Sequence, residues 1–460
     1  MKTRLSLHRN LAATPIEKIL GPLQRAFHSE AFPGLLLLGA AIVAMIWANG
    51  PWSAAYHSLW RETRFGVSAG GFDLSKPLLL WVNDGLMAIF FFLVGLEIKR
   101  EVLAGQLSSF RQAVLPLAAA VGGMAAPGLI YLALNPSGEA ARGWGIPMAT
   151  DIAFSLGVLA LCGRHVPSAA RVFLTAFAIV DDIGATLIIA VFYTESVSGG
   201  HLLAGAIVAL AMTGLNLLGV RHALPYSLLG AVLWYLFLKS GVHPTVAGVL
   251  AAITIPARPR VGAGDFRTSA REGLEDVDRS ADDQHHVLAN PELAQAIYEV
   301  EGTCRLAQTP LQMFERALHP WVSALIMPVF ALANAGVVLE PGTGQVFGNA
   351  TTLGVAAGLI FGKAVGVGGA AWLAVRLGLA TLPAGVSWRQ MLGLSLLGGI
   401  GFTMSLFIAG LAFHDPALNT AAKVGILVGS AVSGWGGWLV LRSTRARHSA
   451  AAAASAVRLE

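Results

Sequence analysis

The chain has 460 residues, of which 55% are hydrophobic and only 12% are charged, and its formal net charge is +5. Soluble domains carry about 25% charged residues, so this composition excludes a soluble protein and indicates one that lies in a lipid bilayer. We expect no nucleic-acid partner. The two cysteines, Cys162 and Cys304, are too far apart in the sequence to indicate a disulfide framework or a metal site.

The N-terminal residues 1–31 are polar and basic and lack the apolar core of a signal peptide. They are followed by apolar stretches that are long enough to span a bilayer, or nearly so. We count about twelve, with an uncertainty of one in residues 201–256. The stretches are 32–49, 78–96, 113–134, 144–162, 172–193, 201–220, 223–238, 243–256, 319–337, 350–375, 391–413 and 420–441. The sequence therefore predicts an all-α polytopic fold and one integral membrane domain over residues 1–460.

The distribution of Lys and Arg predicts the orientation of these spans. If both termini are cytoplasmic, 24 of the 31 basic residues flank the spans on the cytoplasmic side and five lie on the other side. Basic residues concentrate in cytoplasmic loops. We therefore expect a multi-pass protein of the bacterial inner (plasma) membrane, with a cytoplasmic N-tail and a cytoplasmic C-tail over residues 442–460.

Two polar connections interrupt the apolar pattern. Residues 63–67 and 72–75 flank a Ser-Ala-Gly-Gly turn, which predicts a small extracytoplasmic β-hairpin over about residues 62–76. Residues 257–318 form a long, charged cytoplasmic loop. Within it, Asn290-Pro291 and Thr309-Pro310 each predict the start of a helix, because a capping residue precedes a proline.

Five charged residues fall well inside the predicted spans: Asp84, Asp151, Asp181, Asp182 and Lys363. A charge at the centre of a bilayer costs at least about 2.5–3.5 kcal/mol, so each is a candidate functional residue. For Asp84, a packing or hydrogen-bonding role is an equal alternative.

The pair Asp181-Asp182 lies ten residues into an apolar helix, in the sequence FAIVDDIGA. Two neighbouring carboxylates cannot both stay ionised in a dry site unless a cation or a basic group lies nearby. Adjacent residues of a helix point about 100° apart, so one carboxylate can face a cavity while the other faces a neighbouring helix. The pair is therefore our candidate cation site.

Three further features belong with this pair. Lys363 is a candidate partner for one of the carboxylates, in the small-residue segment GLIFGKAVG. Asp151 follows Gly143, Gly145 and Pro147, which predicts a break in the fourth span, and Gly398–Ser405 (GGIGFTMS) predicts a matching break in the eleventh. Paired breaks of this kind are typical of transporters whose ion site is formed by discontinuous helices in inverted repeats.

Six motifs together resemble the NhaA family of bacterial Na⁺/H⁺ antiporters over roughly residues 16–441. They occur in the order found in that family, which makes the resemblance specific. The motifs are residues 91–101 (FFLVGLEIKRE), 147–154 (PMATDIAF), 177–184 (FAIVDDIG), 240–245 (SGVHPT), 319–321 (HPW) with 330–336 (FALANAG), and 399–405 (GIGFTMS).

The resemblance implies a role for each matching residue of the ion site. Asp181 and Asp182 would bind Na⁺, with Asp182 as the direct ligand, and Lys363 would pair with Asp181. Thr150 and Asp151 would lie at the break of the fourth span. Asp151 would offset the N-terminal dipole ends of the broken helices, and Lys363 the C-terminal ends.

The resemblance also implies a group of residues that respond to pH: Glu97, Lys99, Arg100, Glu101, His243 and Glu315. His243 has an alternative reading as a satisfied histidine at the start of a helix. Arg316 stands where family members are expected to have His, and the 257–318 loop is longer than usual. Both departures affect the expected pH threshold and leave the ion site unchanged.

The expected function is secondary active export of Na⁺ or Li⁺ in exchange for H⁺, with two protons per ion, regulation by cytoplasmic pH, and no cofactor or enzymatic activity. The hairpin is expected to join two copies as a homodimer. Three other classes remain as alternatives: a proton-coupled organic-anion transporter, a cation channel and an intramembrane hydrolase. Lys363 as the single midplane base argues against the first, and the absence of a nucleophile or metal motif argues against the third.

Overall fold

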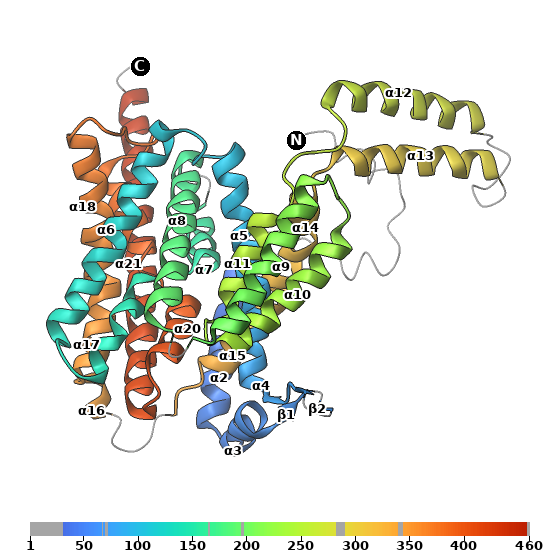
Figure 1. Cartoon of the computed structure of the whole chain (residues 1–460). Helices are drawn as coiled ribbons and strands as arrows, with labels where there is room; N and C mark the ends of the chain where they lie inside the picture. Colours follow the sequence, from blue (N-terminus) through green and yellow to red (C-terminus); the bar gives the residue numbers. More distant parts are fainter. Residues whose placement is uncertain are drawn as a thin grey trace. The chain divides into compact units, whose positions relative to one another are not determined.

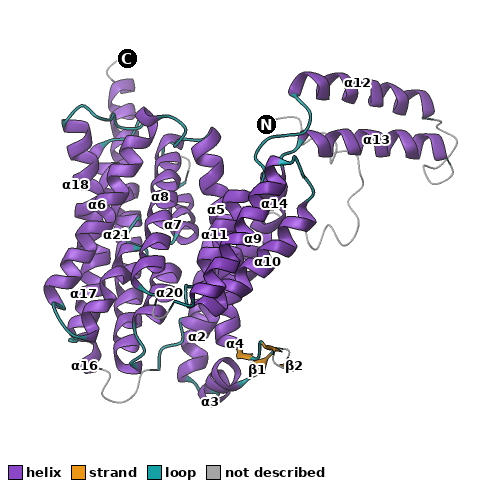
Figure 2. Cartoon of the chain, in the orientation of Figure 1, coloured by secondary structure: helices purple, strands orange, loops and turns teal. Residues whose placement is uncertain are grey.

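The computed structural model describes residues 31–66, 68–69, 72–163, 166–194, 197–281, 290–338 and 344–457. Most of these residues are helical, and among them strands occur only in one short ribbon (Figure 2). The predicted N-tail and the middle of the long loop lie outside the described residues. The chain divides into two compact units, each made of separate stretches of sequence. Whether residues 1–460 behave as one membrane domain stays a prediction.

The first unit contains residues 1–60, 111–185 and 327–460. Its helices are α2 (Phe32–Asn49), α3 (Ser53–His57), α6 (Phe110–Leu134), the 3₁₀ helix η4 (Glu139–Met148), α7 (Ile152–Leu161), α8 (Ser168–Phe192) as far as Ala185, α15 (Met327–Asn334), α16 (Gly344–Phe347), α17 (Ala350–Ala357), α18 (Lys363–Arg376), α19 (Trp388–Leu397), α20 (Phe402–Ala412) and α21 (Pro416–Val457). The π-helical turns η2 (Ser58–Glu62), which starts in this unit, and η7 (Gly358–Gly362) complete it.

The second unit contains residues 61–110 and 186–326. Its helices are α4 (Leu78–Leu80), the π turn η3 (Trp81–Leu86), α5 (Met87–Ala104), α9 (Gly199–Leu217), α10 (Ala223–Ser240), α11 (Pro244–Thr254), α12 (Ala263–Ser280), α13 (Pro291–Ala307), α14 (Pro310–Trp321) and the π turn η6 (Val322–Ile326). Its buried apolar cluster joins α5, α9, α10, α11 and α14 and includes Leu96, Met212, Leu233 and Ala252.

The predicted membrane spans are confirmed. In the described residues, nine helices are long and apolar enough to cross a membrane, and two further helix pairs, η4–α7 and α19–α20, are bent by 43° and 45° at a short break. The shorter apolar helix α11 corresponds to the predicted stretch 243–256. The two bent pairs are the predicted fourth and eleventh spans, so both helix breaks lie where the Gly- and Pro-rich sequences placed them.

The described residues of the long polar connection contain one more helix than the sequence predicted. Asn290 and Thr309 are the N-caps of α13 and α14, as predicted, and Thr309 forms a capping box with Gln312. The sequence did not predict α12, which pairs with α13 as a helical hairpin (Figure 1). Ion pairs four residues apart, such as Arg271–Glu275 and Arg305–Glu301, lie on its exposed surface.

The predicted β-hairpin is also present. Strand β1 (Arg64–Phe65) pairs antiparallel with β4 (Lys76–Pro77), and β2 (Ser68–Ala69) pairs with β3 (Phe72–Asp73). Each pairing covers two residues, so the strands are shorter than the predicted runs. Ser68 and Ala69 were predicted in the turn but form β2, because the ladder continues past the predicted end of the first strand. Trp81 holds the ribbon to the following helix, because its indole N–H donates to the carbonyl of Phe65 at 2.7 Å.

Glycine permits the closest helix contacts within each unit. A methyl group at Gly122 of α6 would meet the carbonyl oxygen of Gly366 in α18, and one at Gly366 would meet the carbonyl of Gly122. The two backbones therefore touch directly, as at other small-residue interfaces between membrane helices. Gly248 of α11 approaches the backbone of α5 at Ala88 in the same way.

We predict that Gly366→Ala lowers the thermal unfolding midpoint of the detergent-solubilised protein, because the added methyl group collides with backbone that cannot rotate away. Overpacking of this kind costs about 1–3 kcal/mol. Gly369→Ala is the matched control, since it lies one turn further along α18 with no heavy atom within 4 Å of the added carbon. Equal unfolding midpoints for the two variants would contradict the close approach of α6 and α18.

Candidate functional site

The two broken helices of the first unit form hydrogen bonds to each other's backbone groups at their breaks. The amide of Asp151 donates to the carbonyl of Ile400 at 2.6 Å, and the hydroxyl of Thr150 donates to the carbonyl of Gly398 at 2.7 Å. Ala149 and Asp151 are extended, so the chain between η4 and α7 is not helical. In the interior of a membrane, no water is present to form hydrogen bonds with backbone N–H and C=O groups that are not in a helix. The breaks are therefore joined by direct hydrogen bonds.

Asp151 connects the N-termini of two helices. Its Oδ1 accepts from the amide of Phe154 at 2.9 Å as the N-cap of α7, and its Oδ2 accepts from the amide of Thr403 at 3.2 Å and the hydroxyl of Thr403 at 2.5 Å. The Thr403 amide belongs to the first turn of α20. One carboxylate thus lies at the positive ends of two helix dipoles, which is the placement that the proposed compensating role requires. That role stays a prediction.

Asp181 and Lys363 form a buried ion pair. The Lys363 ammonium lies 2.9 Å from Oδ1 and 2.8 Å from Oδ2 of Asp181, and both side chains are completely buried. The backbone amide of Thr150 also donates to Asp181. Phe177, one turn before Asp181 in α8, places its ring 5.4 Å from the ammonium. The pairing suggested by the sequence is therefore present in the structure.

Asp182 is fully buried next to this pair. The positive charge of Lys363 acts on Asp182 as well as on Asp181. Together with Asp151, the site holds three carboxyl groups and one ammonium group, so it has an excess of negative charge when all are ionised. A buried site of this kind needs either a cation or protons to balance it.

The donor set at this site consists of oxygen atoms. Within the residues that the structure describes, no three His, Cys, Asp or Glu side chains come together as a metal-binding group. Two neighbouring carboxyl groups and the oxygen of the Thr150 hydroxyl are the oxygen ligands at this place. Hard cations are bound by such oxygen ligands. The site can therefore exchange a cation for protons, with the cation as cargo.

Sequence reasoning missed three residues of this site: Ser155, Thr403 and Ser405. Each is fully buried and hydrogen-bonds across the two broken helices. Their residue types gave little signal, because a hydroxyl in a membrane helix usually bonds to its own backbone. Only the crossing of the helices shows which carbonyl each one reaches.

Most of the residues expected to respond to pH come together in the second unit. Arg100 pairs with Glu315 of α14 and, at 3.3 Å, with Glu101. Glu97 lies within the electrostatic reach of these three residues. Lys99 instead donates to the carbonyls of Ile253 and Ile255 at 2.5 Å each, at the C-terminus of α11.

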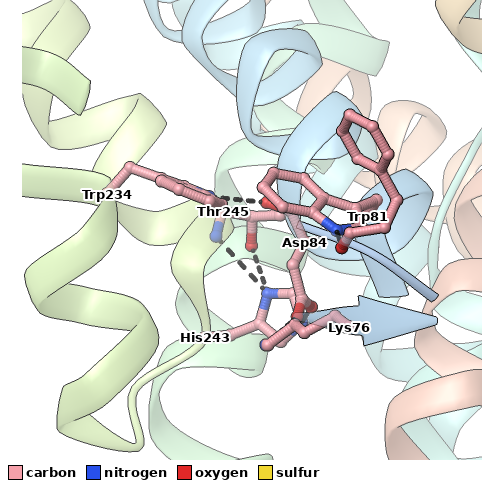
Figure 3. A network of polar contacts seen from close by, with 7 residues as sticks. Lys76, Trp81, Asp84, Trp234, His243 and Thr245 are labelled. Carbon is pink, nitrogen blue, oxygen red and sulfur yellow. Dashed lines mark hydrogen bonds and ion pairs between the residues drawn. The ribbon is translucent and has the colours of Figure 1, made fainter. Parts of the chain in front are cut away.

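His243 lies at the other end of α11 from the carbonyls that Lys99 contacts. A helix of eleven residues is about 16 Å long, so the two places are about that far apart. It is the N-cap of α11, and its Nδ1 lies 2.8 Å from the Thr245 hydroxyl (Figure 3). Its Nε2 lies 3.7 Å from Asp84, which pairs with Lys76 at 2.9 Å. His243 is thus a capping residue at a helix start, and its response to pH stays a prediction.

Asp84 is the centre of this second polar network. Besides Lys76 and His243, its backbone carbonyl accepts from the indole N–H of Trp234 at 2.8 Å, and Trp234 stacks on Trp81 (Figure 3). The network therefore holds the start of the second span against α10 and the start of α11. Hydrogen bonding is the role that the structure describes for Asp84.

Comparison with known proteins identifies relatives over almost the whole chain. Residues 24–441 match the model of the family described as Na⁺/H⁺ antiporter 1. The chain is 52% identical over 431 residues to a Na⁺/H⁺ antiporter NhaA of Oleidesulfovibrio alaskensis, covering 94% of this chain and 96% of that protein. It is 46% identical to NhaA 1 of Saccharophagus degradans, covering 92% of each chain, and 45% identical to NhaA 2 of Syntrophotalea carbinolica, covering 93% and 97%.

We predict that Lys363→Ala lowers the free energy of unfolding by about 3–5 kcal/mol, because it leaves the Asp181 carboxylate buried without its counter-charge. Lys363→Arg should be milder, since it keeps the charge. The double variant Lys363→Ala/Asp181→Asn should recover much of the loss, because it removes both charges. Chemical denaturation of the purified protein measures all three variants. A double variant as unstable as Lys363→Ala alone would show that the ion pair is not the cause.

Proposed function

The chain belongs to the Na⁺/H⁺ antiporter 1 family, and we propose that it exports Na⁺ or Li⁺ from the cytoplasm in exchange for protons. As a member of this family it is a secondary active transporter and not an enzyme. The observation that carries the proposal is the buried site of Asp181, Asp182 and Lys363 beside two crossed, broken helices. Such a site binds a cation without a resident cofactor.

The exchange follows from charge balance in a dry site. Without a cation, protons neutralise the carboxyl groups that Lys363 does not balance. A Na⁺ ion that enters from the cytoplasm supplies the positive charge instead, so Asp182 releases its proton and becomes the ligand. A second proton comes from Lys363, whose pairing with Asp181 the ion disturbs. Two protons in for each ion out would move one net positive charge inward, which makes transport electrogenic.

In the proposed cycle, movement of the helix bundles exposes the site first to one side of the membrane and then to the other. Discontinuous helices keep the ion ligands together while one bundle rocks against another. The excess of Lys and Arg beside the spans supports an orientation with both termini in the cytoplasm, in the inner membrane. Regulation by cytoplasmic pH is assigned to the group around Glu97, Arg100, Glu101 and Glu315.

The site also separates this function from its alternatives. An organic-anion transporter needs a positive charge that can pair with its substrate, whereas the Lys363 ammonium pairs with Asp181. A channel needs no proton release, whereas a cation at this site must replace protons because the carboxyl groups are buried. The membership of an antiporter family further favours exchange.

Everted membrane vesicles that contain a pH-sensitive dye test the substrate and the coupling. Addition of Na⁺ or Li⁺ should restore the dye's fluorescence, and K⁺ should have no effect. Asp181→Asn should abolish this response. Asp151→Asn should slow exchange only about fivefold, since Asn still caps a helix and the lost dipole interaction is worth about 1 kcal/mol. A response to K⁺ equal to that to Na⁺, or full exchange in Asp181→Asn, would contradict the proposal.

We predict that Glu97→Cys and Glu315→Cys each shift the pH of half-maximal exchange by about one unit, because each removes a charge that other charges of the group feel. Maximal exchange should change little, since neither residue lies at the ion site. The same vesicles, assayed from pH 6 to pH 9, measure both quantities. Glu299→Gln is the control, since its exposed partner is Gln295 of the same helix. A lower maximum with an unchanged pH profile would instead place Glu97 or Glu315 on the ion path.

We also propose that the β1–β4 ribbon joins two copies of the chain. In the described residues, each sheet has only two strands, and an exposed strand edge is able to pair with another chain. Deletion of residues 63–75 should leave exchange largely intact and shift the protein to the monomer position on a sizing column. A deletion variant that elutes as the dimer would contradict this interface.

A further inference from the structure

Two buried serines make matching contacts across the broken helices. Ser155 Oγ donates to the carbonyl of Leu397 at 2.8 Å, and Ser405 Oγ donates to the carbonyl of Ile146 at 2.7 Å. Both serines are fully buried. Each contact runs from the second half of one broken helix to the first half of the other, so the two contacts are reciprocal.

The two serines also occupy equivalent positions. Ser155 is four residues after Asp151, the N-cap of α7, and Ser405 is four residues after Gly401, the N-cap of α20. Their backbone amides donate to the carbonyls of Asp151 and Gly401 at 2.9 Å each. The same turn of each second half-helix therefore carries a hydroxyl, and each hydroxyl is aimed at the end of the opposite first half-helix.

The carbonyls that these hydroxyls reach lie in the last turns of η4 and α19. Ile146 is two residues before the end of η4, and Leu397 is the last residue of α19. The last carbonyls of a helix have no intrahelical donor and carry the negative end of its dipole. The Lys363 ammonium, expected from the family resemblance to offset these ends, donates to both oxygens of Asp181. The serine hydroxyls thus supply hydrogen-bond donors at both of these helix ends.

The position of the crossing matters for the ion site. Thr150, one residue before Asp151, donates both to Gly398 and to Asp181. A shift of either break would therefore move Thr150, a hydrogen-bond donor of Asp181. A binding site loses affinity when its supporting contacts loosen.

We infer that Ser155 and Ser405 are positioning residues that lock the two helix breaks together and so set the affinity of the site for its cation. The inference rests on the proposed cation exchange at this site. It extends that function to two residues that touch neither Asp181 nor Asp182 in the contacts described above. Their role is to fix where the backbone oxygens and Thr150 lie.

The test compares three alanine variants in the dye-containing vesicles. Ser155→Ala and Ser405→Ala should each raise the KM for Na⁺ about fivefold, the effect of one lost buried hydrogen bond, with maximal exchange within about twofold of wild type. Ser395→Ala is the matched control. Ser395 is equally buried in α19, but its hydroxyl donates to Met391 of the same helix at 2.8 Å. Its removal should leave the KM unchanged, since a hydroxyl bonded to its own helix contributes little.

Serine-to-cysteine variants keep the assay informative if an alanine variant does not fold. Ser155→Cys and Ser405→Cys retain a weak donor in nearly the same volume, so the KM should lie between those of wild type and alanine. An unchanged KM in the Ser155 and Ser405 variants, or an equal rise in Ser395→Ala, would overturn the inference and leave the proposed function standing. A wild-type chain that shows no exchange would overturn the proposed function instead.

A double-mutant cycle tests the serines independently of transport. The effects of Ser155→Ala and Ser405→Ala on the free energy of unfolding should be non-additive, because both bonds close the same crossing. Ser155→Ala combined with Ser395→Ala should be additive. Additivity in both pairs would overturn the coupling of the two serines, whatever the vesicles show.

Discussion

A membrane interior offers no water to a broken helix, and this constraint governs how the ion site is built. Each break exposes amides and carbonyls that an unbroken helix would satisfy itself. Here the two breaks satisfy each other through Asp151, Thr150, Thr403 and the two serines. The non-helical backbone can therefore lie inside the protein, where the amide of Thr150 donates to Asp181. The hydrogen bonds that satisfy the backbone groups at the breaks also fix the geometry of the site.

The buried charges follow the same logic. Asp151 lies at the N-termini of α7 and α20, and Lys363 is paired with Asp181, so each has a defined electrostatic partner. Asp182 adds a carboxyl group beside a pair that is already balanced. The site then carries more negative than positive charge, which a proton or a cation can neutralise, and exchange between the two is the function that we propose.

The sequence predicted the parts of this fold that depend on local composition. Apolar length predicted the spans, Gly and Pro predicted both breaks, and Asn290 and Thr309 predicted two helix starts. A counter-charge for Lys363 in the Asp181-Asp182 pair was predictable because a charge in a span must find a counter-charge, and the family resemblance implied Asp181 as the partner. The contacts of Ser155, Thr403 and Ser405 were not predictable, since a hydroxyl carries no signal of which distant carbonyl it reaches. Helix α12 was missed because its charged sequence has no apolar stretch.

The central claim is that a cation and a proton compete for Asp182, and proton release from the purified protein measures this most directly. Addition of Na⁺ to wild-type protein in a weakly buffered detergent solution should acidify the solution, with an amplitude that depends on pH. In Asp182→Asn the side chain cannot hold the exchangeable proton, and the amide oxygen is a weaker ligand. We therefore predict that this variant releases no protons on Na⁺ addition at any pH. Release of wild-type amplitude from Asp182→Asn would contradict the account.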